Sequence, residues 1–296
     1  MIKLLSLLIA GVSLGSMYAM VAMGFVVIFK STRAVNFAHG SLLLLGGTVI
    51  SSTHEQLGFY GAVALGVVVT ALAAMLIQVA VLSRAPGASP EAITIITIGM
   101  DILLLTYLTA RLGVDLHELG HPWGGGAVKV GDLGMTVNRL IGLVVAAVII
   151  GCFFVAFKKS SWGIAMRAAA EDPEAASLVG LRLWWVSASA WLVAGGLACA
   201  AAVFLTGAPT PGLSPSLSVL GLIALPAAII GGLTSVYGAL IGGLLIGVVE
   251  SLTTGYQGEL LFLGRGFGPV APWVVLLLVL LFRPDGLFAD KRGVRV

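Results

Sequence analysis

The five residues His117-Glu118-Leu119-Gly120-His121 match the H-E-x-x-H zinc pattern. In a zinc protease, two histidines one helical turn apart hold the metal, and the glutamate between them acts on the zinc-bound water. Here Gly113 and Asp115 precede the pattern, and Pro122, Trp123 and three glycines follow it. These flanking residues favour turns over a rigid helix. We therefore expect a surface loop without a metal, and an intramembrane zinc protease based on 117–121 is the least favoured alternative.

Asp101 is an acidic residue near the middle of the apolar run 92–112. A carboxylate at that depth in a bilayer costs about 2.5–3.5 kcal/mol on insertion scales unless it meets water or a partner. It could line a translocation path and bind the amine of a substrate or a cation. Alternatively, it is a protonated or hydrogen-bonded carboxyl tied to Thr97 or Thr106.

The charged stretch 158–182 contains a short segment with the signals of a capped helix. Asp172 suits the N-cap, Pro173 suits the first helical position, and Gly180 suits the stop. Between them lies a small apolar surface, formed by Ala175, Ala176, Leu178 and Val179. A helix of about two turns is not stable alone in water. The segment is therefore predicted to dock onto a partner.

The elements that must position these residues are membrane helices. The chain is 59% hydrophobic and 10% charged, whereas soluble domains carry about 25% charged residues. Apolar runs lie near 4–29, 41–57, 60–82, 92–112, 138–157, 184–206, 217–232, 236–255 and 270–282. The run 217–232 is shorter than the usual ~17–25 residues and contains Pro226, so it could be broken or re-entrant. The predicted fold is an all-α polytopic membrane protein of eight or nine transmembrane helices, forming one domain over residues 1–296.

Lysines and arginines predict the orientation, because they concentrate in cytoplasmic loops. With the loop 158–183 placed in the cytoplasm, five of the sixteen basic residues fall outside: Lys3, Arg111, Lys129, Arg139 and Arg265. This count favours a cytoplasmic C-terminus, an N-terminus outside, and an extracytoplasmic loop at 113–136.

Small residues at four-residue spacing let helix backbones approach closely. Gly238 with Gly242, and Gly243 with Gly247, show this spacing, as does Gly11 with Gly15. We expect them to pack helices together, and their seam could open and close during transport. The segments 36–43 and 235–241 also resemble each other, which suggests two parallel repeats.

The sequence also limits the chemistry. It contains no G-x-x-x-x-G-K-[ST] nucleotide-binding loop, so ATP used for transport would be bound by another subunit. Neither a cofactor site nor a basic-aromatic patch typical of nucleic-acid binding is evident.

The motifs together resemble those of the branched-chain amino acid (LIV-type) permeases of ABC importers. The resemblance rests on 14–19 (LGSMYA), 36–40 (NFAHG), 231–239 (GGLTSVYGA) and 283–288 (RPDGLF), and on the coupling motif at 171–180. These motifs occur in the family's order. The resemblance implies a helical permease subunit that pairs with a second permease, homologous or identical, two cytoplasmic ABC ATPases and an extracytoplasmic solute-binding protein in the bacterial inner membrane.

The resemblance also implies which residues act. ATPase coupling would fall to Glu171, Asp172, Pro173, Glu174, Ala175, Ala176, Ser177, Leu178 and Gly180. The candidates for the translocation path are Asn36, His39, Thr97 and Asp101. Asp101 stands where the family is expected to have a small uncharged residue, so a urea, amide or aromatic-acid substrate stays open beside a branched-chain amino acid. An ion-gradient-driven secondary transporter is the main alternative, and Asp101 is its one candidate midplane group.

Overall fold

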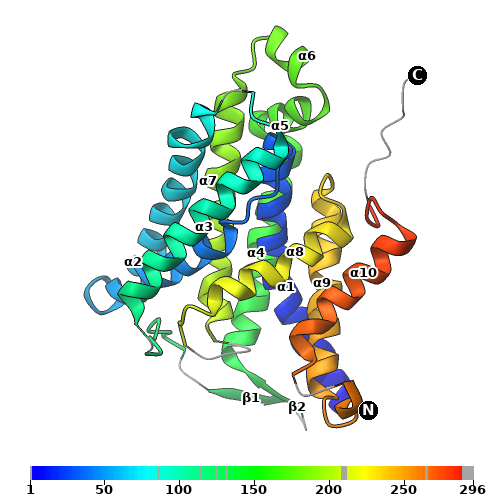
Figure 1. The fold of residues 1–296 in the computed structure, drawn as a ribbon. Helices are drawn as coiled ribbons and strands as arrows, with labels where there is room; N and C mark the ends of the chain where they lie inside the picture. Colours follow the sequence, from blue (N-terminus) through cyan, green and yellow to red (C-terminus); the bar gives the residue numbers. More distant parts are fainter. Residues whose placement is uncertain are drawn as a thin grey trace.

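The computed structural model describes residues 2–85, 87–113, 115–123, 126–130, 133–207, 212–263 and 266–288. Ten α-helices dominate this part of the chain (Figure 1). They are α1 (Ile2–Thr32), α2 (His39–Ala80), α3 (Pro90–Leu112), α4 (Val137–Lys159), α5 (Ser161–Glu171), α6 (Pro173–Leu178), α7 (Leu183–Leu205), α8 (Leu217–Gly231), α9 (Val236–Gly255) and α10 (Ala271–Phe282). Six helical segments are long and apolar enough to cross a membrane, namely Ile2–Thr32, His39–Arg84, Pro90–Leu112, Val137–Lys159, Leu183–Leu205 and Val236–Gly255. The helical, polytopic class is thus confirmed.

Local capping residues determine where several helices begin. The Ser89 hydroxyl accepts a hydrogen bond from the Ala92 amide (3.3 Å) at the start of α3, and Ser235 does the same for Gly238 (3.1 Å) at the start of α9. Such side chains satisfy amides that have no partner within the helix. At the end of α3, Gly113 has φ +68°, a backbone conformation that favours glycine.

Helix α2 bends at Gly58, whose φ of 69° and ψ of 165° are not helical. The two halves then lie against each other, because a Cβ on Gly66 would come within 2.7 Å of Ile50 Cγ1. At 1.5 Å per residue the halves are about 28 Å and about 33 Å long, close to the thickness of a bilayer core. The separate runs predicted at 41–57 and 60–82 therefore correspond to the two halves of one bent helix.

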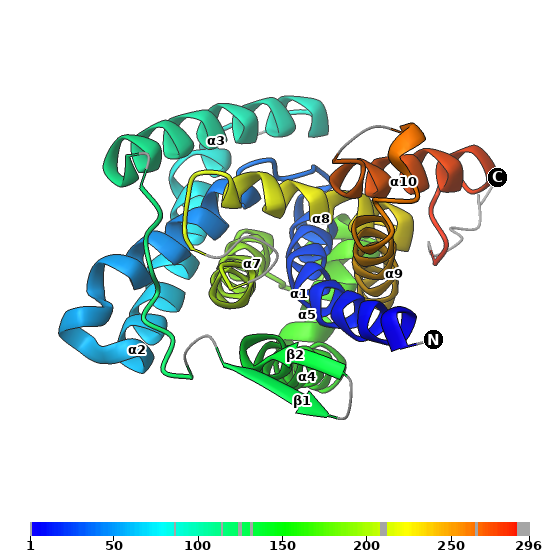
Figure 2. The same cartoon turned by 90° about the horizontal axis from the view of Figure 1, so that it is seen from below.

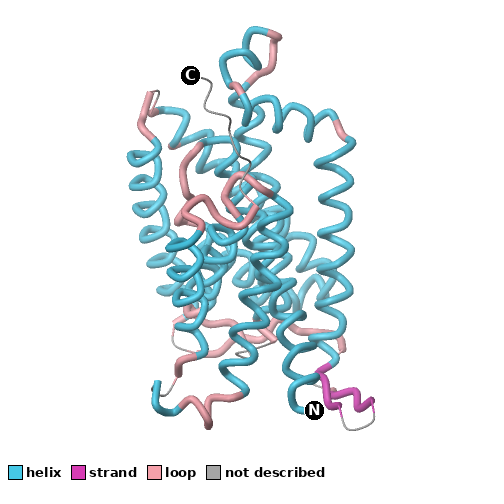
Figure 3. The backbone as a smooth tube through the Cα atoms, turned by 90° about the vertical axis from the view of Figure 1, so that its right-hand side faces the viewer, coloured by secondary structure: helices cyan, strands magenta, loops and turns pink. Residues whose placement is uncertain are grey.

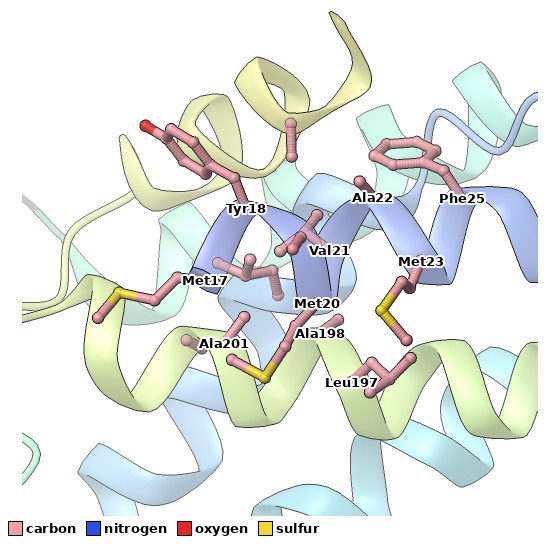
Figure 4. Close-up of a cluster of buried hydrophobic side chains, with 14 of the residues drawn as sticks. Met17, Tyr18, Met20, Val21, Ala22, Met23, Phe25, Leu197, Ala198 and Ala201 are labelled. Atoms are coloured by element: carbon pink, nitrogen blue, oxygen red, sulfur yellow. The ribbon is translucent and has the colours of Figure 1, made fainter. Parts of the chain in front are cut away.

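Helices α1 and α7 form the centre of the bundle, as the end-on view in Figure 2 shows. Helices α2 and α3 lie on one side of them, and α9 and α10 on the other. From Met17 to Ile28, every side chain of α1 is buried. Figure 4 shows Met20 and Met23 of α1 packed beside Leu197 and Ala198 of α7. Flexible methionine side chains fill irregular gaps of this kind.

Close backbone contact joins α1 to α9, and we call it the α1–α9 contact. A Cβ on Gly247 would lie 2.2 Å from the backbone of Gly15, and one on Gly243 would lie 2.5 Å from Ala19. Gly238 and Gly242 face the other side, where α8 passes, and a Cβ on Gly242 would lie 2.1 Å from the Ala227 carbonyl oxygen. The two glycine pairs of α9 thus pack against two different helices.

Helix α8 is continuous through Pro226, so this segment is short but not broken. It runs obliquely across the bundle, and α10 is oblique as well (Figures 1 and 2). Neither reaches the length of the six long segments. The sequence allows the run 217–232 to be broken or re-entrant, and the structure shows an uninterrupted helix of 15 residues through Pro226.

The segment between α3 and α4 contains an antiparallel hairpin of β1 (Ala127–Val130) and β2 (Leu133–Thr136). The sequence had not indicated these strands. The hairpin and the start of α1 lie at one end of the bundle, whereas α6 lies at the other (Figures 1 and 3). The two loops predicted on opposite sides of the membrane are therefore at opposite ends of the molecule.

Candidate functional sites

Helix α6 is defined by caps made from neighbouring residues. At its start, Asp172 Oδ1 accepts a hydrogen bond from the Ala175 amide (3.0 Å), and Pro173 occupies the first turn. At its end, Gly180 has φ +89° and the Leu181 amide donates to the Ala176 carbonyl (3.1 Å). A glycine in the left-handed conformation, together with a backbone hydrogen bond back to the last turn, is a common way for a helix to end. The chain thus leaves α6 in a defined direction.

The apolar tip of α6 is exposed. Leu178 is 88% exposed and Val179 80%, whereas Ala176 is buried against the rest of the loop. Glu171, Glu174, Ala175 and Ser177 are exposed as well. Exposed leucine and valine at the outermost point of a bundle offer a small apolar contact surface (Figure 1).

Helix α5 precedes α6 and was not foreseen from the sequence. It packs through Met166 and Ala169, which are buried. Its carbonyl at Ala170 accepts a hydrogen bond from the Arg33 guanidinium (2.8 Å), just beyond the end of α1. The α5–α6 unit is therefore attached to the central helix.

The last turn of α1 also contacts other helices. The Lys30 ammonium donates to the Thr234 carbonyl (2.7 Å) in the turn between α8 and α9. The Ser187 hydroxyl of α7 donates to the Ser31 carbonyl (3.3 Å). One end of α1 thus connects the α6 loop, α7 and the α8–α9 turn.

The four candidates for the translocation path gather where α1 turns into α2. Thr97 of α3 accepts a hydrogen bond from the Phe37 amide (3.1 Å), and Asn36 accepts one from the Ala38 amide (3.0 Å). His39 is fully buried, with its ring 4.6 Å from that of Phe25. These contacts hold the 33–38 turn inside the bundle.

Asp101 lies beside Ser41 at the start of α2. No hydrogen bond within the described residues joins it to Thr97 or Thr106, the partners considered from the sequence. Its Oδ1, both ring nitrogens of His39 and the side-chain nitrogen of Asn36 are buried without a hydrogen-bond partner among the described residues. Unpaired buried polar atoms of this kind are rare and mark a place where water or a ligand can bind.

The amino-acid sequence matches one family of known proteins over most of its length. The model of the family "branched-chain amino acid transport system / permease component" matches residues 7–282. The chain belongs to this family. LivH proteins, named as permease proteins of a high-affinity branched-chain amino acid transport system, are 30% identical in Salmonella typhimurium and in Escherichia coli. In each case the alignment covers 94% of this chain and 92% of the relative.

BraD of Pseudomonas aeruginosa, with a corresponding description, is 29% identical over 95% of this chain and 94% of its own length. Among solved structures, "PsaBC from Streptococcus pneumoniae in complex with Fab" aligns with a TM-score of 0.47 and 15% identity, over 96% of this chain and 91% of that one. That likeness is too distant to bear on function. The family resemblance found in the motifs is thus confirmed.

The H-E-x-x-H segment of this permease is not helical. His117 pairs through its backbone with Leu213, and its ring nitrogen lies 2.8 Å from the Leu112 carbonyl oxygen. His121 instead stacks on Trp123, with ring centroids 5.2 Å apart. The two imidazoles are therefore not presented from successive turns of a helix, which the zinc chemistry requires.

Glu250 is not among the translocation-path candidates, and its place near the outer end of its helix favours an interfacial or bundle-facing hydrogen-bonding group. The permease buries it in α9, where one carboxylate oxygen accepts a hydrogen bond from the Tyr18 hydroxyl (2.9 Å). It lines a pocket of about 160 Å³ near the end of the bundle opposite α6. The pairing joins residues 232 positions apart, so no local pattern could have revealed it.

Proposed function

We propose that this protein is the permease subunit of an ATP-driven importer. It forms half of the translocation path for a branched-chain amino acid or a similar small amino acid, amide or carboxylate solute. One observation carries the proposal: a capped helix presents Leu178 and Val179 to solvent at one end of a bundle of membrane helices. The family match and the names of the relatives support it.

The assembly we propose contains two cytoplasmic ABC ATPases, a second permease and an extracytoplasmic solute-binding protein. In the bacterial inner membrane, the loop 158–183 and the C-terminus face the cytoplasm, and the N-terminus and the 113–136 segment face outside. Counting the two halves of α2, with α8 and α10 as short spans, gives nine crossings. Two parallel repeats would then relate α1 with the first half of α2 to α8 with α9.

Coupling would begin when ATP closes the ATPase dimer and moves α6. Glu174 is exposed and makes no side-chain hydrogen bond or ion pair within the described residues, so it can orient α6 against a partner. The hydrogen bond from Arg33 to Ala170 then passes the movement to α1. Since α1 is also bonded to the α8–α9 turn through Lys30, both halves of the permease respond together.

The turn that holds Asn36 and His39 would form part of the path. Its buried polar atoms lie between α1, α2 and α3, which lead from the α6 end toward the opposite end. Exchanging Asp101 for Asn keeps the shape and removes the charge. We expect uptake to fall while the complex still assembles, and unchanged uptake would make Asp101 structural.

The test of the proposal is uptake of radiolabelled L-leucine, urea and benzoate by vesicles with and without the partner ATPases and ATP. ATP-dependent uptake of one of these solutes supports the importer, whereas uptake that follows an imposed ion gradient without ATPase supports the secondary transporter. Glu174→Lys or Gly180→Trp should leave expression intact and uncouple transport from ATP hydrolysis, so that ATP is hydrolysed without uptake. Normal uptake in both variants would remove the coupling role of α6.

A further inference from the structure

A pocket at the end opposite α6 is lined by one acidic and one basic residue, which form no ion pair with each other among the described residues. It lies between the first half of α1, the last turns of α9 and the first turn of α4. Glu250 and Arg139 both line it. Neither forms an ion pair within the described part of the chain.

Both side chains can form more hydrogen bonds than they make with the described residues. Glu250 is 4% exposed, and the Tyr18 hydroxyl is the donor that meets its carboxylate among the described residues. An ionised carboxylate offers about four acceptor sites. The Arg139 guanidinium makes no hydrogen bond to any described residue, although guanidinium groups favour paired contacts with carboxylates.

The walls of the pocket are fixed without a ligand. The Ser13 hydroxyl donates to the Arg139 carbonyl (3.0 Å), and the Ser251 hydroxyl donates to the Leu7 carbonyl (2.8 Å). These bonds tie α1 to α4 and to α9. Leu14 and Met17 give the same pocket an apolar side.

The size of the pocket favours a small ligand. Its volume of about 160 Å³ corresponds to about five water molecules at ~30 Å³ each. Pockets that bind drug-sized ligands have volumes of about 300–1,000 Å³.

We infer that this pocket binds the zwitterion of an α-amino acid, with its ammonium at Glu250, its carboxylate at Arg139 and its side chain against Leu14 and Met17. The inference rests on the proposed import function and adds a binding site within the permease. At the end opposite α6, the site would receive the solute before it crosses the bundle.

The first experiment measures binding of radiolabelled L-leucine to the permease–ATPase complex in nanodiscs, without the solute-binding protein. Glu250→Gln and Arg139→Gln should each weaken binding about tenfold or more, because each removes a charge-assisted contact. Arg111→Gln and Glu259→Gln are matched controls. Arg111 stacks over Tyr107 and Glu259 pairs with Lys3, so both lie outside the pocket. Isoamylamine and 4-methylpentanoate, which each keep one of the two charges, should compete weakly.

A second measurement does not depend on how the charge variants fold. In a Cys152→Ser background, L-leucine should slow maleimide labelling of Thr254→Cys in the pocket, and should not affect Thr53→Cys on α2.

Undetectable leucine binding by the wild-type complex, or charge variants that bind like their controls, would overturn the proposed amino-acid site in the pocket. If leucine uptake by the complete wild-type importer is driven by ATP in either case, the import proposal survives. Failure of the wild-type importer to move any of the tested solutes with ATP overturns the proposed function itself.

Discussion

Helix α6 and the α1–α9 contact differ in the distance along the chain that they bridge. The caps of α6 join residues within nine positions, and its apolar tip faces solvent. The α1–α9 contact joins residues more than 200 positions apart and buries backbone against backbone. The first is stable only in the context of its loop and is available to a partner. The second is complete within the chain. Substitutions in the α1–α9 contact should therefore lower stability, whereas substitutions at the tip of α6 should weaken binding to a partner.

Gly247→Leu should produce the largest loss of stability. A Cβ there would lie 2.2 Å from the Gly15 backbone, which has no side chain that can move aside. Overpacking of this kind costs about 1–3 kcal/mol and sometimes more, and we expect the upper part of that range. The measurement is the unfolding temperature of the purified permease. Gly151→Leu on α4 is the control, because its Cβ would meet nothing within 4 Å; an equal loss there would contradict a specific contact at Gly247.

Replacing both Leu178 and Val179 with Asp should leave the unfolding temperature unchanged and reduce uptake. Both side chains are exposed, so the fold loses little, whereas a docked partner would lose its apolar contact. Loss of an interface hot spot of about 2 kcal/mol corresponds to about thirtyfold weaker binding. Affinity for the ATPase subunits and ATP-dependent uptake are the measurements. Ile164→Asp on α5 is the control, since Ile164 is also apolar and 56% exposed. An equal effect there would show that α6 is not the specific docking surface.

The same contrast explains what the sequence could predict. The caps of α6 depend on Asp172, Pro173 and Gly180, which lie within nine residues, and all three adopt the expected positions. The apolar runs predicted the long helices because hydrophobicity is a local property. Helix α5 was missed because its buried face consists of Gly163, Met166 and Ala169, and two of these three residues are too small to form a recognisable apolar run. The contacts of Glu250 with Tyr18, and of Asp101 with Ser41, depend on how distant helices pack, which no local pattern contains.

Asp172→Ala should weaken α6 by about 1 kcal/mol, because it removes the acceptor for the Ala175 amide. Hydrogen exchange of the α6 amides measures this local effect. Asp172→Asn is the matched control, since asparagine caps helices about as well as aspartate. If the Asn variant exchanged as fast as the Ala variant, the charge of Asp172 rather than its cap would stabilise α6.

The smallest expected effect is a change in hydrogen exchange in the loop 115–123. This loop tests whether a local element at the end opposite α6 also opens independently of the α1–α9 contact. Burial lowers the pKa of His121, while the charge of Glu118 opposes that shift. A histidine whose pKa is lower in the folded state binds more protons when unfolded. Its contribution to stability is therefore present above about pH 6.5 and is lost as the pH falls below that value.

Hydrogen exchange of this loop should accelerate at pH 5.5 in the wild type relative to His121→Phe at the same pH. The phenyl ring can still pack on Trp123 and Phe59, but it cannot take up a proton. Amides of α9 near Gly243 and Gly247 serve as the internal reference, because the α1–α9 contact there is made between backbone atoms. If α9 responded in parallel with the loop, the two would unfold as one unit, and the separation between local and long-range contacts would not hold at this end of the molecule.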